Sequence, residues 1–457
     1  MRRALLLALL AACAVSGPLS GPADAAKRKR PVVEAAREKV QGAGTAKPAL
    51  DKASPIAAPA AAKAGPAIPA AAASAGPLDA VRLLEAQSAL GVRLVDLLAA
   101  SSGNKGPANI AVSPASLASV MALLDLGASE QMHRALHKML ALDLRAGANP
   151  VTDLEAVRTA VGDLAKAEGT GPLTTANAVF FDESSKPFEL AVAGLQSKGA
   201  DVSVGKLSDP ATLERINAIV SKRTHGLIPT ILDRPPAAAG LVAVNALHFK
   251  DRWRMPFAEK NTATALFRLV DGRSVDVSMM RSASRPMMFR QDERFIAVDL
   301  PYATEGFSLV VLTTKGKAVP PKELAAAQSW LTGAGFSEKE GEVSLPRFGF
   351  SQAADLLEAV DKLGLKPARS SKTAFAGLSP APQAVSAISQ KAIIAVDEKG
   401  TEAAAATAVV TARGLNTDAV KMVVDKPFMF ALRQQGSGLM LILGYVGDPT
   451  GAPVPKS

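Results

Sequence analysis

The sequence predicts an α+β fold, because helical patterns dominate its first part, strand patterns dominate its last part, and the two do not alternate in a fixed repeat. The 457 residues exceed one average domain but fit one large domain, and a hydrophobic content of 48% allows a sizeable buried core. We therefore expect large antiparallel or mixed sheets with helices packed around them, and not a doubly wound parallel sheet.

The helices expected near the start of the folded part have clear local signals. Apolar residues between Val81 and Leu98 recur at helical spacing. Ser113 and Pro114 suit the cap and the first turn of a second helix, which ends near Leu126. Further helices are expected at about 129–140, 211–224 and 355–363.

The strands are expected in apolar, β-branched or alternating runs, most of them in the second half of the chain. These runs are 176–181, 241–249, 267–280, 295–301, 307–313, 387–396, 420–424, 427–433 and 439–446.

Residues 1–25 have the pattern of an export signal: two arginines, an apolar run too short to span a bilayer, and a small-residue cleavage site at Ala23–Ala25. A second interpretation competes, since Leu10–Cys13 resembles a bacterial lipoprotein cleavage box that would place a lipid on Cys13. Both predict an exported protein, either free in the periplasm or outside the cell, or lipid-anchored. Cys13 is the only cysteine, so an intramolecular disulfide is excluded.

Residues 26–77 are rich in Ala, Pro and Lys, and we expect a disordered linker there. Residues 1–77 hold 11 Lys and Arg against 4 Asp and Glu, which accounts for +7 of the net charge of +10. The folded domain, expected at 78–450, is therefore nearly neutral, and it has no basic stripe typical of nucleic-acid binding. A short tail, 451–457, ends the chain.

The segment that follows the expected strand 387–396 suits neither a loop, a helix nor a strand. It is alanine-rich up to Ala406 and then β-branched. Gly400 can adopt backbone angles closed to other residues. On an extended chain one face would carry only small side chains, so it could enter a packed sheet without overfilling it. That face consists of Thr401, Ala403, Ala405 and Thr407.

At these residues the chain resembles a known family. The segment Glu398–Thr407 resembles the hinge of an inhibitory serpin. Further motifs occur in serpin order at Asn109–Ser116, Ala176–Phe180, Ile216–Gly226, Leu241–Phe257, Met279–Met280, Leu300–Tyr302, Leu345–Phe348, Asp425–Phe430 and Gly444–Pro449. The chain is thus identified as an inhibitory, bacterial-type serpin. The resemblance implies three β-sheets, surrounding helices and an exposed reactive loop, here residues 398–420.

The resemblance also implies roles for single residues. Glu398 should pair with Arg281, and Trp253 should pack nearby, so that these three hold the top of the main sheet closed as a gate. A polar cluster beneath the opening sheet should contain Ser113, Ser116, Asn217 and Gln390, the last at a position where serpins usually have His.

The resemblance further implies a suicide mechanism in which a serine protease attacks the reactive loop and is trapped when the loop enters the sheet. Arg413–Gly414 is the favoured scissile bond, because Arg413 is the only basic residue between Lys399 and Lys421. Cleavage after Arg413 predicts a trypsin-like partner. Gly414–Leu415 is the alternative and predicts a chymotrypsin- or subtilisin-like partner. No cofactor is expected, and the protein should be a monomer.

Two other classes of function were weighed. An enzyme is disfavoured, because no Gly-x-Ser-x-Gly elbow or phosphate loop is present. His133 and His137 lie one helical turn apart, but we expect a solvated helix face there and no metal site. A non-inhibitory serpin that acts as a binding or storage protein is the closer alternative, but the small residues of the hinge favour inhibition.

Overall fold

The structure, a computed structural model, describes residues 79–101, 109–140, 150–165, 171–236, 240–381, 384–401 and 419–450. Its helices are α1 Ala80–Ser101, α2 Pro114–Asp125, α3 Glu130–Met139, α4 Pro150–Ala165, α5 Glu189–Ser197, α6 Pro210–Arg223, α7 Pro321–Leu324, α8 Leu357–Val360 and α9 Lys366–Ser370. Short helical turns occur at η2 Glu183–Ser185, η3 Glu259–Asn261, η4 Ala325–Thr332 and η5 Asp361–Leu365. Among the described residues, no helix is long and apolar enough to cross a membrane.

The first sheet has seven strands in the order β3-β2-β4-β13-β14-β5, with β12 paired to β13. Its strands are β2 Leu173–Asp182, β3 Asp201–Gly205, β4 Leu241–Phe249, β5 Asp251–Arg252, β12 Phe348–Asp355, β13 Val385–Val396 and β14 Gly400–Thr401. Its two central long strands, β4 and β13, are directly paired and run parallel, with Gln390 opposite Asn245.

The second network has ten strands in the order β1-β17-β16-β10-β9-β8-β11-β7-β6, and β15 pairs with β11. Its strands are β1 Asn109–Val112, β6 Ala263–Arg268, β7 Ser274–Arg281, β8 Arg285–Gln291, β9 Phe295–Pro301, β10 Phe307–Thr314, β11 Ser337–Pro346, β15 Val420–Val423, β16 Phe428–Gln434 and β17 Leu439–Val446. Strand β11 pairs with β8 through Ser337–Gly341 and with β7 through Ser344–Pro346. This network therefore contains two of the three expected sheets, which are joined through β11.

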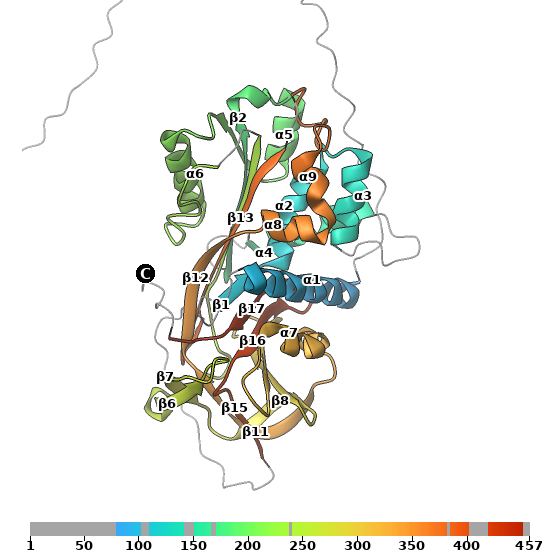
Figure 1. The fold of residues 1–457 in the computed structure, drawn as a ribbon. Helices are drawn as coiled ribbons and strands as arrows, with labels where there is room; N and C mark the ends of the chain where they lie inside the picture. The colour runs from blue at the N-terminus through green and yellow to red at the C-terminus, as the bar shows by residue number, and fades with distance from the viewer. Residues whose placement is uncertain are drawn as a thin grey trace, which may run out of the picture. The chain divides into compact units, whose positions relative to one another are not determined.

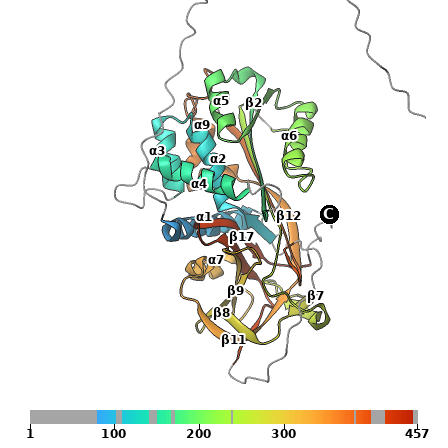
Figure 2. The same ribbon diagram turned by 180° about the vertical axis from the view of Figure 1, so that it is seen from behind.

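Helix α2 lies in the core of the fold. Every residue from Pro114 to Leu124 is buried, and the helix contacts both β4 of the first sheet and β17 of the second. Helix α6 lies on the opposite face of the seven-stranded sheet from α2 and α3, as both views show (Figure 1 and Figure 2). A second apolar cluster fills the space between α6 and that sheet, with Ile216 and Val220 of the helix among its members.

The local helix signals are confirmed, but one predicted strand is wrong. The side chain of Ser113 caps α2 with Pro114 in its first turn, and Ser129 caps α3. The single strand expected over 267–280 is instead a hairpin of β6 and β7. The chain turns between them at Gly272, whose positive φ of 87° interrupts the apolar run.

Candidate functional site: the hinge of the reactive loop

The hinge begins where β13 ends at Val396 and the chain reverses. The Asp397 carboxylate accepts hydrogen bonds from the backbone N–H groups of Lys399, at 2.8 Å, and Gly400, at 3.1 Å. The backbone N–H of Asp397 donates to the Gly400 carbonyl at 2.9 Å. A Cβ on residue 400 would stand 2.1 Å from the Asp251 carbonyl oxygen. Only glycine fits this turn, which the sequence had marked at Gly400.

After the turn, the two residues of β14 lie between two other strands. Thr401 pairs antiparallel with Val396 of β13 on one side, and Gly400 and Thr401 pair antiparallel with β5 on the other. Strand β5 follows β4 after a single residue, so β14 lies between β13 and the short strand that continues β4. The start of the reactive loop is therefore already a strand between β13 and β5.

Thr401 is fixed by its side chain as well as by its backbone. It is 0% exposed, and its hydroxyl lies 2.6 Å from the Tyr302 hydroxyl. Burial raises the pKa of the Tyr302 phenol far above its ordinary value, so that the hydroxyl stays protonated and available for this hydrogen bond. The Thr401 side chain is thus closed off from solvent, and the hydroxyl that it contacts is uncharged.

Trp253 packs against the same turn, as expected. Its indole N–H donates to the Asp397 carbonyl at 2.9 Å, and its backbone N–H donates to the Lys399 carbonyl at 2.8 Å. The indole stacks on the Tyr302 ring, with 4.5 Å between ring centroids. One aromatic pair therefore supports both the turn and the pocket of Thr401.

The ion pair at the gate differs from the expected one. The Glu398 carboxylate accepts hydrogen bonds from the Arg347 guanidinium, at 2.8 and 2.9 Å from Nε and 2.8 Å from Nη2, and from the Thr262 hydroxyl. Arg281, the partner expected from the sequence, is an exposed residue at the end of β7, where it pairs with Ser344 of β11. Arg347 is the partner instead, because it connects β11 to β12, whose first residue, Phe348, pairs with Val396 just before the hinge turn.

The Glu398 carboxylate is only 3% exposed, whereas the Arg347 side chain is 48% exposed. Burial alone would raise the pKa of Glu398, but the hydrogen bonds from Arg347 and Thr262 bring this pKa below its ordinary value. The carboxylate is therefore charged at neutral pH and depends on these partners.

Removing Arg347 leaves a buried carboxylate without its charged partner. We expect Arg347→Ala to lower the unfolding free energy by about 2 kcal/mol, less than for a fully buried pair because Arg347 is half-exposed. Arg281→Ala is the matched control and should change it by less than about 0.5 kcal/mol, as for other surface sites. Urea unfolding midpoints of the intact variants measure the difference. Equal effects of the two substitutions would contradict this assignment.

The same pair gives a pH dependence. Because the folded-state pKa of Glu398 is lowered, its contribution to stability is present above the ordinary glutamate pKa of about 4.3 and is lost as the pH falls through the folded-state value. Arg347→Ala should therefore cost most at neutral pH and least in acid.

A buried polar cluster lies further from the hinge along β13, at the start of α2. Gln390 of β13 accepts a hydrogen bond from the Ser113 backbone N–H at 2.7 Å and donates to the Ser113 carbonyl at 2.9 Å. Asn245 stands opposite Gln390 on β4 and donates to Asn177 of β2 at 2.7 Å. Three strands and the first turn of α2 are thus linked beneath the β4–β13 boundary.

Two of the cluster's polar atoms, Ser116 Oγ and Asn245 Oδ1, have no hydrogen-bond partner among the described residues. Buried polar atoms without a partner cost stability. The directly paired arrangement of β4 and β13 is consequently less stable than it would be with a fully hydrogen-bonded cluster.

Asn217 does not belong to this cluster, contrary to the expectation. It lies on α6, where its side-chain oxygen accepts from the backbone N–H groups of Ile231 and Leu232 and its amide donates to the Leu232 carbonyl. Asn217 therefore fixes the loop after α6. Asn245 is the member that the sequence analysis missed, although a single amide in the apolar run 241–247 was a usable signal.

The remaining predicted site residues lie outside the described residues. These are Ala403, Ala405, Thr407, Arg413, Gly414 and Leu415 of the reactive loop and Cys13 of the leader.

An α+β fold with these two strand networks, in which the chain after β13 forms a short strand between β13 and β5, is typical of a serpin. The family model described as Serpin (serine protease inhibitor) matches residues 85–449, and the chain belongs to this family.

Relatives from animals and plants cover most of the chain. Leukocyte elastase inhibitor of Bos taurus is 30% identical over 387 residues, which are 80% of this chain and all of the relative. Glia-derived nexin of Homo sapiens is 32% identical over 367 residues, 75% of this chain and 88% of the relative. Serpin-ZX of Hordeum vulgare is 32% identical over 395 residues, which are 79% of this chain and 96% of the relative.

Solved structures share the fold. The thermophilic serpin Tengpin in its native state superposes with a TM-score of 0.70 at 23% identity, covering 82% of this chain and 96% of that chain. A thyroxine-binding globulin in complex with thyroxine superposes with a TM-score of 0.69 at 22% identity, covering 81% of this chain and 100% of that chain. The fold is thus shared by proteins with different roles, and the function of this chain has to be argued from its hinge.

Proposed function

We propose that this protein inhibits a serine endopeptidase as a suicide substrate and is not itself an enzyme. The observation that carries the proposal is the position of Thr401, which is buried in β14 between β13 and β5. Continuation of β14 by the small residues Ala403, Ala405 and Thr407 would extend it as a strand antiparallel to both β4 and β13. Insertion of such a strand into a sheet is a known conformational switch.

The chemistry requires only the protease's own machinery. Its serine oxygen attacks the carbonyl carbon of Arg413, the peptide bond to Gly414 breaks, and the new amine leaves with a proton. Arg413 is then held as an ester. Hydrolysis by water would release it, but insertion of the loop moves the ester away with the protease. Displacement of catalytic groups by about 1 Å is enough to cost a hundredfold in rate, so the ester persists.

Arg413 is proposed as the specificity residue, which gives a direct test. Incubation with trypsin should yield an SDS-resistant conjugate and, after denaturation, a separate C-terminal fragment that begins at Gly414. Arg413→Ala should reduce the rate of trypsin inhibition by at least about a hundredfold, because trypsin-like pockets select a basic side chain. Intact mass and peptide sequencing identify the bond.

The outcomes of this test separate the alternatives. A chymotrypsin conjugate whose ester is on Gly414, with a C-terminal fragment that begins at Leu415, would favour Gly414–Leu415 as the bond. Cleavage of the loop by either protease without any conjugate would overturn the inhibitory proposal in favour of a binding or storage role.

We further propose that the inhibitor acts outside the cytoplasm, since residues 1–25 have the pattern of an export signal. The mature N-terminus separates the two forms of export: it begins after Ala25 in a freely secreted protein and at a lipidated Cys13 in an anchored one.

A further inference from the structure

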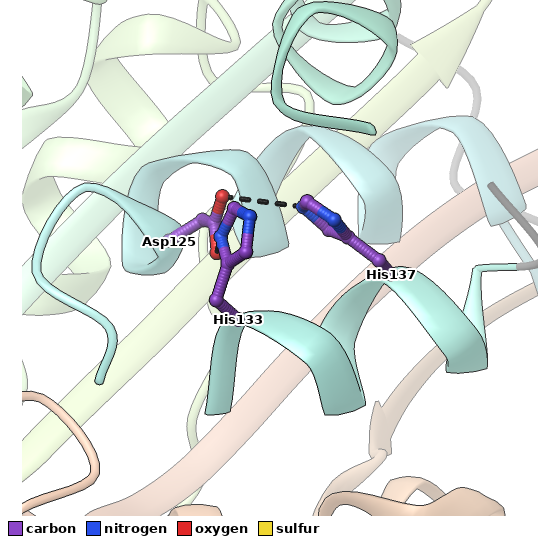
Figure 3. A group of neighbouring side chains, drawn as sticks. All are labelled: Asp125, His133 and His137. Atoms are coloured by element: carbon purple, nitrogen blue, oxygen red, sulfur yellow. Dashed lines mark hydrogen bonds and ion pairs between the residues drawn. The ribbon is translucent and has the colours of Figure 1, made fainter. Parts of the chain in front are cut away.

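Three potential metal ligands converge where α2 ends and α3 begins. Asp125 is the last residue of α2, and His133 and His137 stand one turn apart on the face of α3 that points toward it (Figure 3). His133 Nδ1 lies 2.7 Å from Asp125 Oδ1, and His137 Nε2 lies 3.4 Å from Asp125 Oδ2. The three ligand atoms are all within 4.8 Å of one another.

This site is not the solvated helix face that the sequence suggested. His137 is 2% exposed, and its Nε2 makes no hydrogen bond to any of the described residues. Its ring lies 3.8 Å from the His133 ring, between centroids. A buried ring nitrogen that faces a carboxylate at 3.4 Å without a hydrogen bond to it is costly unless another partner occupies the space between them.

The electrostatics favour a cation as that partner. Asp125 lies at the C-terminal end of α2, where the helix dipole is negative, and the last turn of α2 has no basic residue. A carboxylate at this end of a helix is therefore in an unfavourable field, which a positive charge relieves. The Asp125 side chain is 8% exposed, so solvent contributes little screening.

Two imidazole nitrogens and one carboxylate oxygen are ligands typical of zinc, which leaves a fourth position for water. Tetrahedral bonds of about 2.0–2.1 Å place neighbouring ligand atoms roughly 3.4 Å apart. The distance from His137 Nε2 to Asp125 Oδ2 already has this value, whereas His133 Nδ1 lies 2.7 Å from the other oxygen, Oδ1, and has to move for both rings to share a metal with one oxygen. We propose that Asp125, His133 and His137 form a Zn²⁺ site that fastens α3 to the end of α2.

The position of the site gives it a consequence for the rest of the molecule. The first turn of α2 is bound to β13 through Ser113 and Gln390, and its last residue is a ligand of the site. Zinc therefore fixes the C-terminal end of α2, the helix whose first turn is bound to β13. It stabilises the native form by binding to it.

Zinc titration of the full-length chain, produced without a histidine tag and stripped with a chelator, tests the site. Isothermal calorimetry with ZnCl₂ should show about one equivalent bound per chain. At a hundredfold excess over Kd, zinc should raise the apparent melting temperature by about 3–5 °C at a fixed scan rate. Mg²⁺ should not, because it prefers oxygen ligands. Co²⁺ bound in the same place should show the intense visible absorption of tetrahedral coordination.

Two variants make the result specific. His133→Gln should weaken zinc binding by at least about tenfold without unfolding the protein, because the His133 side chain is 29% exposed. His225→Asn is the matched control: it removes an exposed histidine outside the site, and zinc affinity should not change. The proposal is overturned if no zinc binds to the wild type, or if His133→Gln binds zinc as tightly as the wild type does.

Discussion

Thr401→Arg should abolish inhibition and leave the reactive loop cleavable. Residue 401 is fully buried between β13 and β5, and its side chain ends at the Tyr302 hydroxyl. An arginine there would have to bury a charge and a much longer side chain at the first step of insertion, at a cost of several kcal/mol. Mixing the variant with trypsin should therefore give cleaved inhibitor and active protease, with the SDS-resistant conjugate reduced at least about tenfold.

Two controls separate this effect from general damage. Thr401→Ser keeps the hydroxyl and should form conjugate normally. Glu402→Arg introduces the same charge one position later, on the face that strand alternation directs to solvent, and should retain inhibition. If Thr401→Arg forms conjugate as well as the wild type does, the loop does not enter the sheet by this route.

Cleavage of the reactive loop should make the protein more stable than the intact form. Strands β4 and β13 are parallel neighbours, and a strand inserted between them would make antiparallel hydrogen bonds on both sides. It would also bury the small residues of the loop. Several kcal/mol gained in this way correspond to a rise in melting temperature of about 15 °C or more.

Circular dichroism melting before and after limited digestion with a protease that cuts the loop without being trapped measures this rise, and mass spectrometry confirms that a single bond in the loop was cut. Cleaved Thr401→Arg provides the internal control, because its loop should stay out and its melting temperature should hardly change. An equal rise in the variant and the wild type would mean that the gain comes from cutting alone and not from insertion.

Local signals in the sequence predicted the elements that frame the site. Ser113 with Pro114 marked the start of α2, and Gly400 marked a position of the hinge where a side chain does not fit. Each of these signals depends on a few neighbouring residues, so a single sequence is enough to detect it.

Contacts between distant segments were harder to predict. Arg281 is the last residue of β7 and Arg347 follows the last residue of β11. The choice between them as partner of Glu398 depends on how β7, β11 and the hinge align with one another. Asn217 and Asn245 are likewise two amides in helical and strand segments, and only the pairing of β4 with β13 places Asn245 opposite Gln390. The burial of His137 depends on the packing of α3 against α2.

The parallel pairing of β4 with β13 has one more consequence. A peptide that enters between them is selected by the direction in which it runs and by the smallness of its side chains, since backbone groups supply most of its bonds. The residues proposed for protease recognition, Arg413 and Gly414, come later in the sequence and should take no part in that selection. Substitutions at these recognition residues should therefore change the target protease and leave insertion of the loop unchanged.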